Sequence, residues 1–199
     1  MPVRIVEHQS PGGAQLVRVR GSLIVSSHQA LRELGHFERY RALLPETRRE
    51  QLLSCPANSW LPLELVELHY IACDALGLSE PATRAVGEAV SQRIMGTFLG
   101  TMMRSGRSVD AVPSPWIPLR QYGRICDRLL DGGSHVVTEL GPKAALIETS
   151  GVSLLRFGYV RSAMLGIASG AAGLFAKSCS ASELPTADPA QIRISLHWV

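Results

Sequence analysis

The glycine spacing in GIASGAAG, from Gly166 to Gly173, constrains this chain's fold more than any other stretch of its sequence. Glycines four residues apart are typical of paired membrane helices, and glycine-rich loops are typical of phosphate-binding sites. Within a helix of a globular protein, the same spacing indicates that another element or a ligand approaches the backbone closely. The flanking residues decide between these three interpretations.

The first two interpretations fail on those flanking residues. A membrane-spanning helix needs about 20 consecutive apolar residues, but Arg156 and Arg161 interrupt this segment and Lys177 follows it. A phosphate loop lies where a strand turns into the N-terminus of a helix. These glycines fall well inside a helical run, and no Gly-Lys-Ser/Thr sequence accompanies them. We therefore expect neither a transmembrane segment nor a phosphate loop.

The third interpretation follows from helical geometry, with about 3.6 residues per turn. One side of the helix forms what we call the glycine groove, made of Tyr159, Ala163, Gly166, Gly170, Gly173 and Lys177. About a quarter turn away lies the bulky ridge, made of Val160, Met164, Ile167, Ala171 and Leu174. Because each helical glycine costs about 1 kcal/mol relative to alanine, we expect something to pack against the groove. It is either a sheet or helix, such as the helix expected over 79–104, or a ligand chamber with Tyr159 at its mouth.

The rest of the chain predicts an α+β fold, with a small antiparallel sheet of about four strands packed against about five helices. Alternating apolar residues indicate strands over 15–25 and 191–199, and HVVTEL and KAALIET indicate a hairpin turning at Gly141-Pro142. Helices are expected at about 29–43, 46–53, 64–76, 79–104 and 119–130, besides the buried small-residue helix near the C-terminus. We expect residues 1–13 to be a loose N-terminal segment and 14–199 to be one ligand-binding-like domain.

Composition excludes some classes of function. The chain has 20 basic and 17 acidic residues in 199, a net charge of +3, and its arginines are dispersed, so no nucleic-acid footprint is expected. The four cysteines, Cys55, Cys73, Cys126 and Cys179, form no Cys-x-x-Cys pair and no signal peptide precedes them. Reduced thiols in a cytoplasmic protein are the expectation.

No complete catalytic motif is present, so the chain is not expected to be an enzyme. His69 and Cys73 lie four residues apart on one predicted helix, a spacing that suits a zinc site or an activated thiolate. The simpler interpretation is a core thiol beside a partly buried histidine, because free cysteine usually behaves as a small apolar residue. The same two interpretations apply to Cys126.

Several stretches carry a resemblance to a known family: SWLPLELVELHYIACDAL, GTFLGTMMRSG, RQYGRICDRLLDGGSHVVTELGPKAALIE, the small-residue helix and IRISLHW. The chain resembles a paralogous group of uncharacterised myxobacterial proteins, which is distantly similar to heme-nitric-oxide-binding and four-vinyl-reductase-type ligand-binding domains. The resemblance covers most of the chain after the first strand. It implies a sensor or adaptor fold with an apolar pocket between helices and sheet, which works through protein partners.

The heme function of those domains does not carry over directly. The heme-nitric-oxide-binding domains that the chain resembles use an axial histidine on a helix before the hairpin, and a Tyr-x-Ser-x-Arg motif. Here that helix offers Tyr122 and Cys126 but no histidine, the tetrad from Tyr159 to Ser162 has similar residues in another order, and His135 is expected on a strand. We therefore expect no cofactor, with heme disfavoured.

The function that the sequence favours is a non-catalytic cytoplasmic binding module, which senses a small apolar ligand or acts as a protein–protein adaptor in signalling. The alternatives are a heme-based gas sensor and, less favoured, a thiol- or metal-dependent enzyme. The candidate ligand-binding residues are Phe98, Met102, Trp116, Tyr122, Phe157, Tyr159, Arg161, Met164, Gly166 and Gly170. Arg161 is expected to pair with an acidic ligand headgroup or a core carboxylate.

A protein partner or a homodimer is also expected. If the first and last predicted strands are neighbours, Arg18, Arg20, Arg193 and His197 project from one sheet face. Such a face is usually solvated, but it can also receive an acidic partner or a second subunit.

Overall fold

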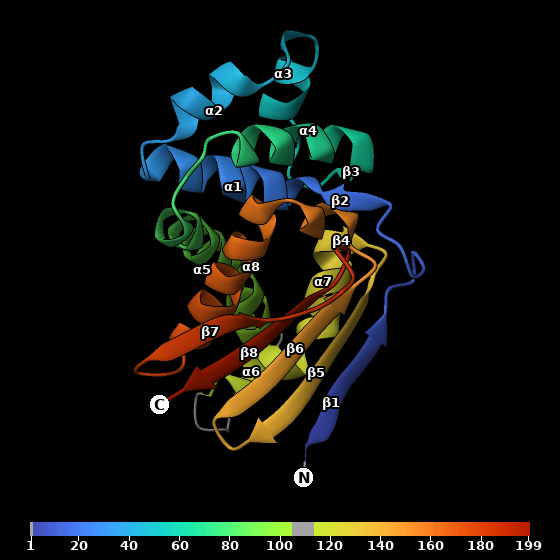
Figure 1. Ribbon diagram of the computed structural model, residues 1–199, viewed down its shortest axis with the longest axis vertical. Coiled ribbons are helices and arrows are strands. Elements are labelled where there is room, and N and C mark those ends of the chain that lie inside the picture. The colour runs from blue at the N-terminus through green and yellow to red at the C-terminus, as the bar shows by residue number, and fades with distance from the viewer. Residues whose placement is uncertain (1, 105–113) are drawn as a thin grey trace.

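The chain forms two antiparallel sheets and eight α-helices within the residues that the structure, a computed structural model, describes (Figure 1). These are residues 2–104 and 114–199, with the backbone alone described at 98–104. In Figure 1 the main sheet lies below, a layer of N-terminal helices lies above, and α5, α7 and α8 run between them. The predicted α+β class is confirmed, although the main sheet has five strands where about four were expected.

The main sheet is antiparallel throughout and has the strand order β1-β5-β6-β8-β7. Its strands in that order are Val3–Gln9, Ser134–Gly141, Ala144–Ser150, Ile192–Trp198 and Cys179–Leu184. The predicted hairpin is β5–β6. Alternation along β8 buries Ile192, Ile194 and Leu196, each at most 1% exposed, as the sequence pattern predicts.

A second, three-stranded sheet has the order β3-β2-β4. Its strands are β2 (Arg18–Arg20), β3 (Trp60–Pro62) and β4 (Leu130–Asp131). Arg18 donates a hydrogen bond of 2.7 Å to the Asp131 carboxylate, so an ion pair adds to the backbone bonds. This small sheet joins the N-terminal helices to the segment that enters the β5–β6 hairpin.

The helices form two groups. The upper group in Figure 1 consists of α1 (Gly21–Glu33), α2 (Phe37–Leu43), α3 (Glu46–Leu53) and α4 (Leu63–Asp74). The second group lies against the main sheet or on its covering helices and consists of α5 (Glu80–Arg104), α6 (Trp116–Arg120), α7 (Tyr122–Leu129) and α8 (Gly158–Gly173). A short 3-10 helix, η1 (Ser153–Arg156), leads into α8.

Helix ends follow the local signals that the sequence contains. The Ala82 amide donates to the Ser79 side-chain oxygen at 3.4 Å, which supports the start of α5 as predicted. Gly77 and Gly35 have φ of +59° and +75°, a region that favours glycine, and each ends a helical stretch. The helix expected over 29–43 is therefore two helices, α1 and α2.

The N-terminal segment was expected to be loose, and the structure corrects this expectation. Val3–Gln9 forms β1, which pairs with β5 along one edge of the main sheet. Most β1 side chains are exposed or half-buried, so the strand carries no strong apolar alternation in its sequence. The side-chain pattern of residues 3–9 does not predict a strand. The strand forms because its backbone pairs with the open edge of β5.

Two further expectations are corrected by the structure. Residues 21–25 continue as helix α1, not as a strand, because Ile24, His28 and Leu31 recur at helical spacing and are buried. The helix expected at 119–130 is divided into α6 and α7.

The basic sheet face expected from the first and last strands does not form. Arg18 and Arg20 belong to β2 in the small sheet, whereas Arg193 and His197 belong to β8 in the main sheet. Both edges of β8 are already paired, with β6 on one side and β7 on the other.

The glycine groove of α8 receives α5 at Gly166 and Gly170, whereas Gly173 has open space where its Cβ would lie. A Cβ atom on Gly166 would overlap the backbone carbonyl of Arg84, and one on Gly170 would lie 3.1 Å from the Cα of Glu88. In the reverse direction, a Cβ atom on Gly87 would overlap the carbonyl of Ala163. The segment is therefore an inward-packed helix, and its groove receives a neighbouring helix, not a ligand.

Candidate functional site

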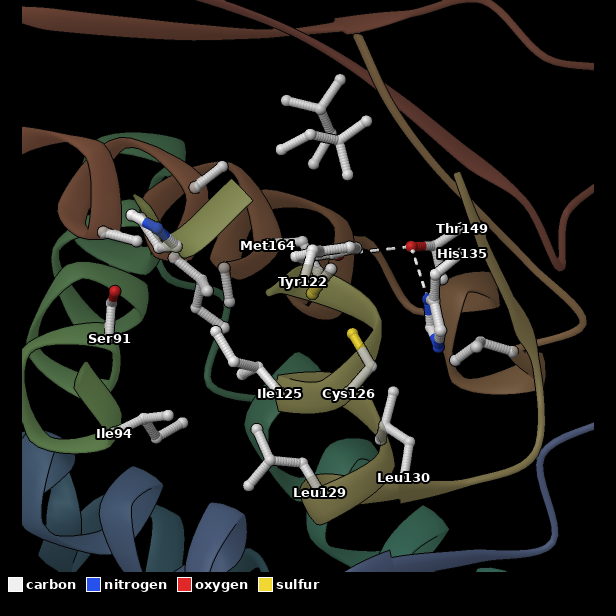
Figure 2. A pocket seen from close by; sticks show the side chains of 18 of the residues that line it. Ser91, Ile94, Tyr122, Ile125, Cys126, Leu129, Leu130, His135, Thr149 and Met164 are labelled. Atoms are coloured by element: carbon white, nitrogen blue, oxygen red, sulfur yellow. Dashed lines mark hydrogen bonds between the residues drawn. The ribbon is translucent and has the colours of Figure 1, made fainter. Parts of the chain in front are cut away.

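An apolar cavity lies between the inner face of the main sheet and the helices that cover it. The sheet side is formed by His135, Ile147, Thr149, Ile194 and Leu196 from β5, β6 and β8. The helical side includes Tyr122, Ile125, Cys126 and Leu129 from α7, Val160, Met164 and Ile167 from α8, and Ser91, Ile94 and Met95 from α5. Figure 2 looks into it, with Ser91 and Ile94 facing the α7 residues across the space.

The cavity is small. Its enclosed volume is about 160 Å³. Pockets for drug-sized ligands measure roughly 300–1,000 Å³. The cavity is smaller than such a pocket, so a larger occupant would have to move the lining side chains apart.

The packing of α8 explains why the cavity lies where it does. Since the glycine groove is pressed against α5, the bulky ridge is turned toward the sheet. Val160, Met164 and Ile167 from this ridge line the cavity. The ridge therefore forms the cavity wall, and of the two occupants that the sequence allowed for the groove, the helix over 79–104 is the one found there, not a ligand chamber.

Three polar side chains form a chain of hydrogen bonds along one wall of the cavity. Thr149 lies directly across the hairpin from His135 in the strand register. Its hydroxyl oxygen is 3.2 Å from Nδ1 of His135 and 3.3 Å from the Tyr122 hydroxyl. Figure 2 shows these contacts as dashed lines, with Cys126 and Met164 close to Tyr122. The remaining ring nitrogen of His135, Nε2, is buried and has no hydrogen-bond partner.

Burial sets the protonation of these groups. Burial lowers the pKa of His135 to about 4, with a smaller contribution from His8 and an opposing one from Asp127. Burial also raises the pKa of the Cys126 thiol to about 12 and raises the pKa of Tyr122. At neutral pH the cavity therefore contains an uncharged imidazole, a protonated thiol and a protonated phenol.

The charge of the cavity walls is as informative as their shape. Among the described residues that line it, there is no lysine, arginine, aspartate or glutamate. A ligand held inside thus meets apolar surface and the single hydroxyl–imidazole chain. A charged headgroup would have to lie outside the lined region, because burying an unpaired charge is costly.

Two of the ten predicted site residues, Tyr122 and Met164, line this cavity. Gly166 and Gly170 contact α5 instead. The side chains of Phe98 and Met102 lie outside the described residues. A direct role for any of them in ligand binding stays a prediction.

The other four predicted residues lie away from the lined walls. Trp116 packs edge-to-face on Trp198, with ring centroids 4.9 Å apart, and its Nε1 donates to a backbone carbonyl. Phe157 lies under the Arg156 guanidinium, 4.8 Å from the ring centroid. Tyr159 is buried beside Tyr70, with ring centroids 6.5 Å apart.

Arg161 is used structurally. Its guanidinium pairs with Glu183 of β7 and donates to the carbonyls of Leu155 and Gln191, each at 3.1 Å. The carboxylate partner expected for Arg161 is therefore supplied by the protein.

His135 and Thr149 are the residues that sequence reasoning missed. The strand pattern HVVTEL places His135 on the same face as Val137, which is fully buried. The hairpin register then brings Thr149 opposite it. Both signals are present in the sequence, but they show only that His135 lies on a strand and not that it reaches a cavity.

A second buried polar cluster lies among the N-terminal helices. The Tyr40 hydroxyl is 2.9 Å from Nε2 of His28 and 2.7 Å from Nδ1 of His69, and His69 also contacts Ser27 and Cys73. Burial lowers the pKa of both histidines and raises that of the Cys73 thiol. A thiol that stays protonated is a poor nucleophile and metal ligand.

Metal binding at this cluster finds no support in the side-chain arrangement. Within residues 2–104 and 114–199, no three His, Cys, Asp or Glu side chains are grouped as a metal site requires. The cluster of His28, Tyr40 and His69 joins α1, α2 and α4, which favours a structural role.

The same described ranges contain no helix that combines the length and the apolar character needed to cross a bilayer.

Solved H-NOX proteins share the fold of this chain. The Fe(II) unliganded H-NOX protein from K. algicida is 10% identical with a TM-score of 0.63, over 90% of this chain and 96% of that one. An oxygen-binding H-NOX domain related to soluble guanylate cyclases, in its oxygen complex, is 13% identical with a TM-score of 0.51, over 90% and 94%. A protein solved for the effect of porphyrin distortion on heme redox potential is 15% identical with a TM-score of 0.53, over the same fractions.

No family model matches the chain, and no curated protein matches it either. The likeness is thus one of fold, and it extends over nearly the full length of the solved domains. It agrees with the predicted distant similarity to heme-nitric-oxide-binding domains. Membership of the myxobacterial group stays a prediction.

The expectation that the chain has no cofactor is corrected by these neighbours, whose names specify Fe(II), heme and bound oxygen. That expectation depended on the absence of a histidine from the helix before the hairpin. The structure shows that a histidine on β5, His135, reaches the cavity beside that helix.

The residues of the cavity fit a heme group on two observations. The walls are apolar, and one imidazole nitrogen, Nε2 of His135, is buried without a partner. Its other nitrogen is held by Thr149, the arrangement typical of metal-ligating histidines.

Proposed function

We propose that this chain is a heme-binding sensor domain that holds the group in the cavity between α7, α8 and the main sheet. The observation that carries the proposal is the unpartnered Nε2 of His135 in an otherwise apolar cavity. The fold likeness to H-NOX proteins supports it. Heme iron, once bound, supplies a coordination position for a diatomic gas.

The residues of this chain would contribute burial and orientation. Met164 and Ile167 of α8 form one wall, and Ile194 and Leu196 of β8 form the facing one. Apolar walls remove the macrocycle's surface from water, and burial of apolar area contributes about 25 cal/mol per Å². The described lining residues include no cation, so none of them would pair with the carboxylates of the group.

A second candidate function is sensing of a small apolar molecule that has no charged groups. The absence of lysine and arginine from the described cavity walls favours it. The two candidates differ in what the protein carries when it is purified, so one measurement separates them.

We further propose that occupancy of the cavity is passed on through protein contacts in the cytoplasm. Tyr70 supports this, because it lines the cavity and also packs edge-to-face on His69, with ring centroids 4.8 Å apart. His69 belongs to the cluster that joins α1, α2 and α4. A protein partner or a second copy of this chain that docks on the N-terminal helices would sense a change there.

Native mass spectrometry of the full chain, purified from cells supplied with a heme precursor, tests the proposal. The expected result is one heme per chain, together with an absorption band near the Soret region. A protein that carries a colourless apolar molecule in the same ratio would favour the second candidate. A protein that carries neither and ignores added hemin would contradict both, and the measured mass also gives the subunit number.

A further inference from the structure

The cavity walls offer several side chains that could donate to iron. Imidazole, thiolate, phenolate and thioether groups all ligate heme iron in proteins. In this chain they are represented by His135, Cys126, Tyr122, Met95 and Met164, all of which line the cavity. Their positions and existing bonds distinguish them.

Tyr122 and Cys126 are poorly prepared to donate. Each would first have to lose a proton, and the described walls contain no cation that would stabilise the resulting anion. The Tyr122 hydroxyl is also engaged with Thr149 at 3.3 Å. The thioethers of Met95 and Met164 need no deprotonation, but they end flexible side chains that no hydrogen bond orients.

His135 is held more firmly than any of these. It lies on β5, which is paired on both sides, opposite His8 of β1 and opposite Thr149 of β6. Its side chain is fully buried. The Thr149 hydroxyl fixes Nδ1 at 3.2 Å, while the Tyr122 ring packs edge-on against the imidazole, 5.7 Å between centroids. Backbone register and two contacts therefore set the orientation of the ring.

The hydrogen bond to Thr149 also bears on where the proton of the neutral ring lies. If Nδ1 carries it, the N–H donates to the threonine oxygen and Nε2 presents a free lone pair. If Nε2 carries it, a buried N–H has no acceptor, because Nε2 has no partner. A buried group without a partner is costly whether it donates or accepts, but only in the first tautomer can Nε2 donate to iron without releasing a proton, so coordination by Nε2 requires that tautomer.

We propose that Nε2 of His135 is the protein donor to heme iron, from a strand and not from the helix before the hairpin. This rests on the proposed function. Thr149 and Tyr122 act as positioning residues, since they hold and orient the imidazole and do not touch the iron. The bond forms from the Nε2 lone pair, and no bond in the protein breaks.

The test compares full-length variants, loaded with hemin and reduced with dithionite, by absorption and resonance Raman spectroscopy. For wild type we expect an iron–histidine vibration. For His135→Ala we expect its loss, and its return with free imidazole, which fills the vacated space. His197→Ala, a change of an exposed histidine on β8, is the matched control and should leave the spectrum unchanged.

The positioning roles have their own readout. Thr149→Val should shift the iron–histidine frequency and weaken hemin affinity roughly 10- to 100-fold, the usual effect of removing such a partner. Thr149→Ser retains the hydroxyl and should show the wild-type iron–histidine frequency and the wild-type hemin affinity. If Thr149→Val only unfolded the protein, its iron–histidine vibration would be lost and not shifted, so a shifted frequency that Thr149→Ser returns to the wild-type value indicates a positioning role.

Nitrogen NMR of the heme-free protein tests the tautomer independently of heme. We expect the proton on Nδ1 and an unprotonated Nε2 at pH 7, and a proton on Nε2 would overturn the assignment. If wild type binds hemin and His135→Ala retains the same spectrum, the donor assignment fails and the proposed function stands. If wild type takes up no hemin, both fail.

Discussion

Gly166 of α8 lies directly against the backbone carbonyl of Arg84 in α5, with no room for a Cβ atom between them. This contact fixes the rotation of α8 about its own axis. Because the groove faces α5, the ridge faces the sheet, and the cavity wall consists of the large apolar residues of that ridge. A packing detail between two helices therefore determines where a ligand can be held.

Gly166→Ala should destabilise the protein. The added methyl group meets backbone, which cannot rotate away, so we expect the free energy of unfolding to fall by about 1–3 kcal/mol, as for other overpacked sites. Gly96→Ala is the control, because that helical glycine is exposed and has open space where its Cβ would lie. There alanine should be neutral or stabilising by up to about 1 kcal/mol. Equal destabilisation in urea unfolding would contradict the packing account.

Acid should weaken the fold between pH 6.5 and 4. Burial lowers the pKa of His28 to about 4, with a smaller contribution from Arg32, and burial lowers the pKa of His69 as well. The unfolded chain then binds more protons than the folded one in this range, so the stability present above pH 6.5 is lost as pH falls. Each group contributes up to about 1.4 kcal/mol per pH unit.

Denaturant unfolding at several pH values measures this dependence. His28→Gln should reduce its slope, whereas His197→Gln, at an exposed position on β8, should not. An unchanged slope in His28→Gln would show that other groups cause the acid sensitivity.

The cysteines should react in an order set by their burial. Cys126 is buried and burial raises its pKa to about 12, and Cys73 is fully buried with its pKa also raised. Cys179 is only partly buried, and burial raises its pKa to about 11. Mass-resolved alkylation of the folded protein should label Cys179 first and Cys73 last. Rapid labelling of Cys73 would instead revive the thiol-dependent enzyme.

Arg161→Met should lower stability without changing hemin binding. Removing the guanidinium leaves the Glu183 carboxylate and two carbonyls without their donor, and hydrogen bonds to charged groups contribute about 1.5–3 kcal/mol. Arg193→Met breaks the more exposed pair with Glu148 and should cost at most about 1 kcal/mol. Weakened hemin binding in Arg161→Met, with stability unchanged, would restore the predicted headgroup contact.

The sequence predicted the elements whose side chains alone decide their structure. The β5–β6 hairpin, β8, α5 and the inward-packed α8 all follow from apolar periodicity and local turn or cap signals. It did not predict β1, which depends on backbone pairing with the edge of β5, nor the helical start of α1, where a short alternating run resembled a strand.

The candidate site was only partly predictable for a related reason. Tyr122 and Met164 were identified as large apolar residues on the right helices. His135 and Thr149 lie on separate strands, and only the register of the hairpin brings them together. The element that packs against the glycine groove could not be predicted, because helical periodicity shows which residues share a face but not which neighbour contacts that face.

Hemin titration of a cavity-filled variant tests the central claim most directly. Ala168 lines the cavity from α8, so Ala168→Phe should occupy part of the space and weaken hemin binding at least tenfold, about 1.4 kcal/mol. Leu174→Phe, at an exposed position near the end of α8, should bind as wild type does. The account predicts saturable one-to-one binding by wild type and by Leu174→Phe, and loss of it in Ala168→Phe. Equal hemin binding by all three proteins would contradict it.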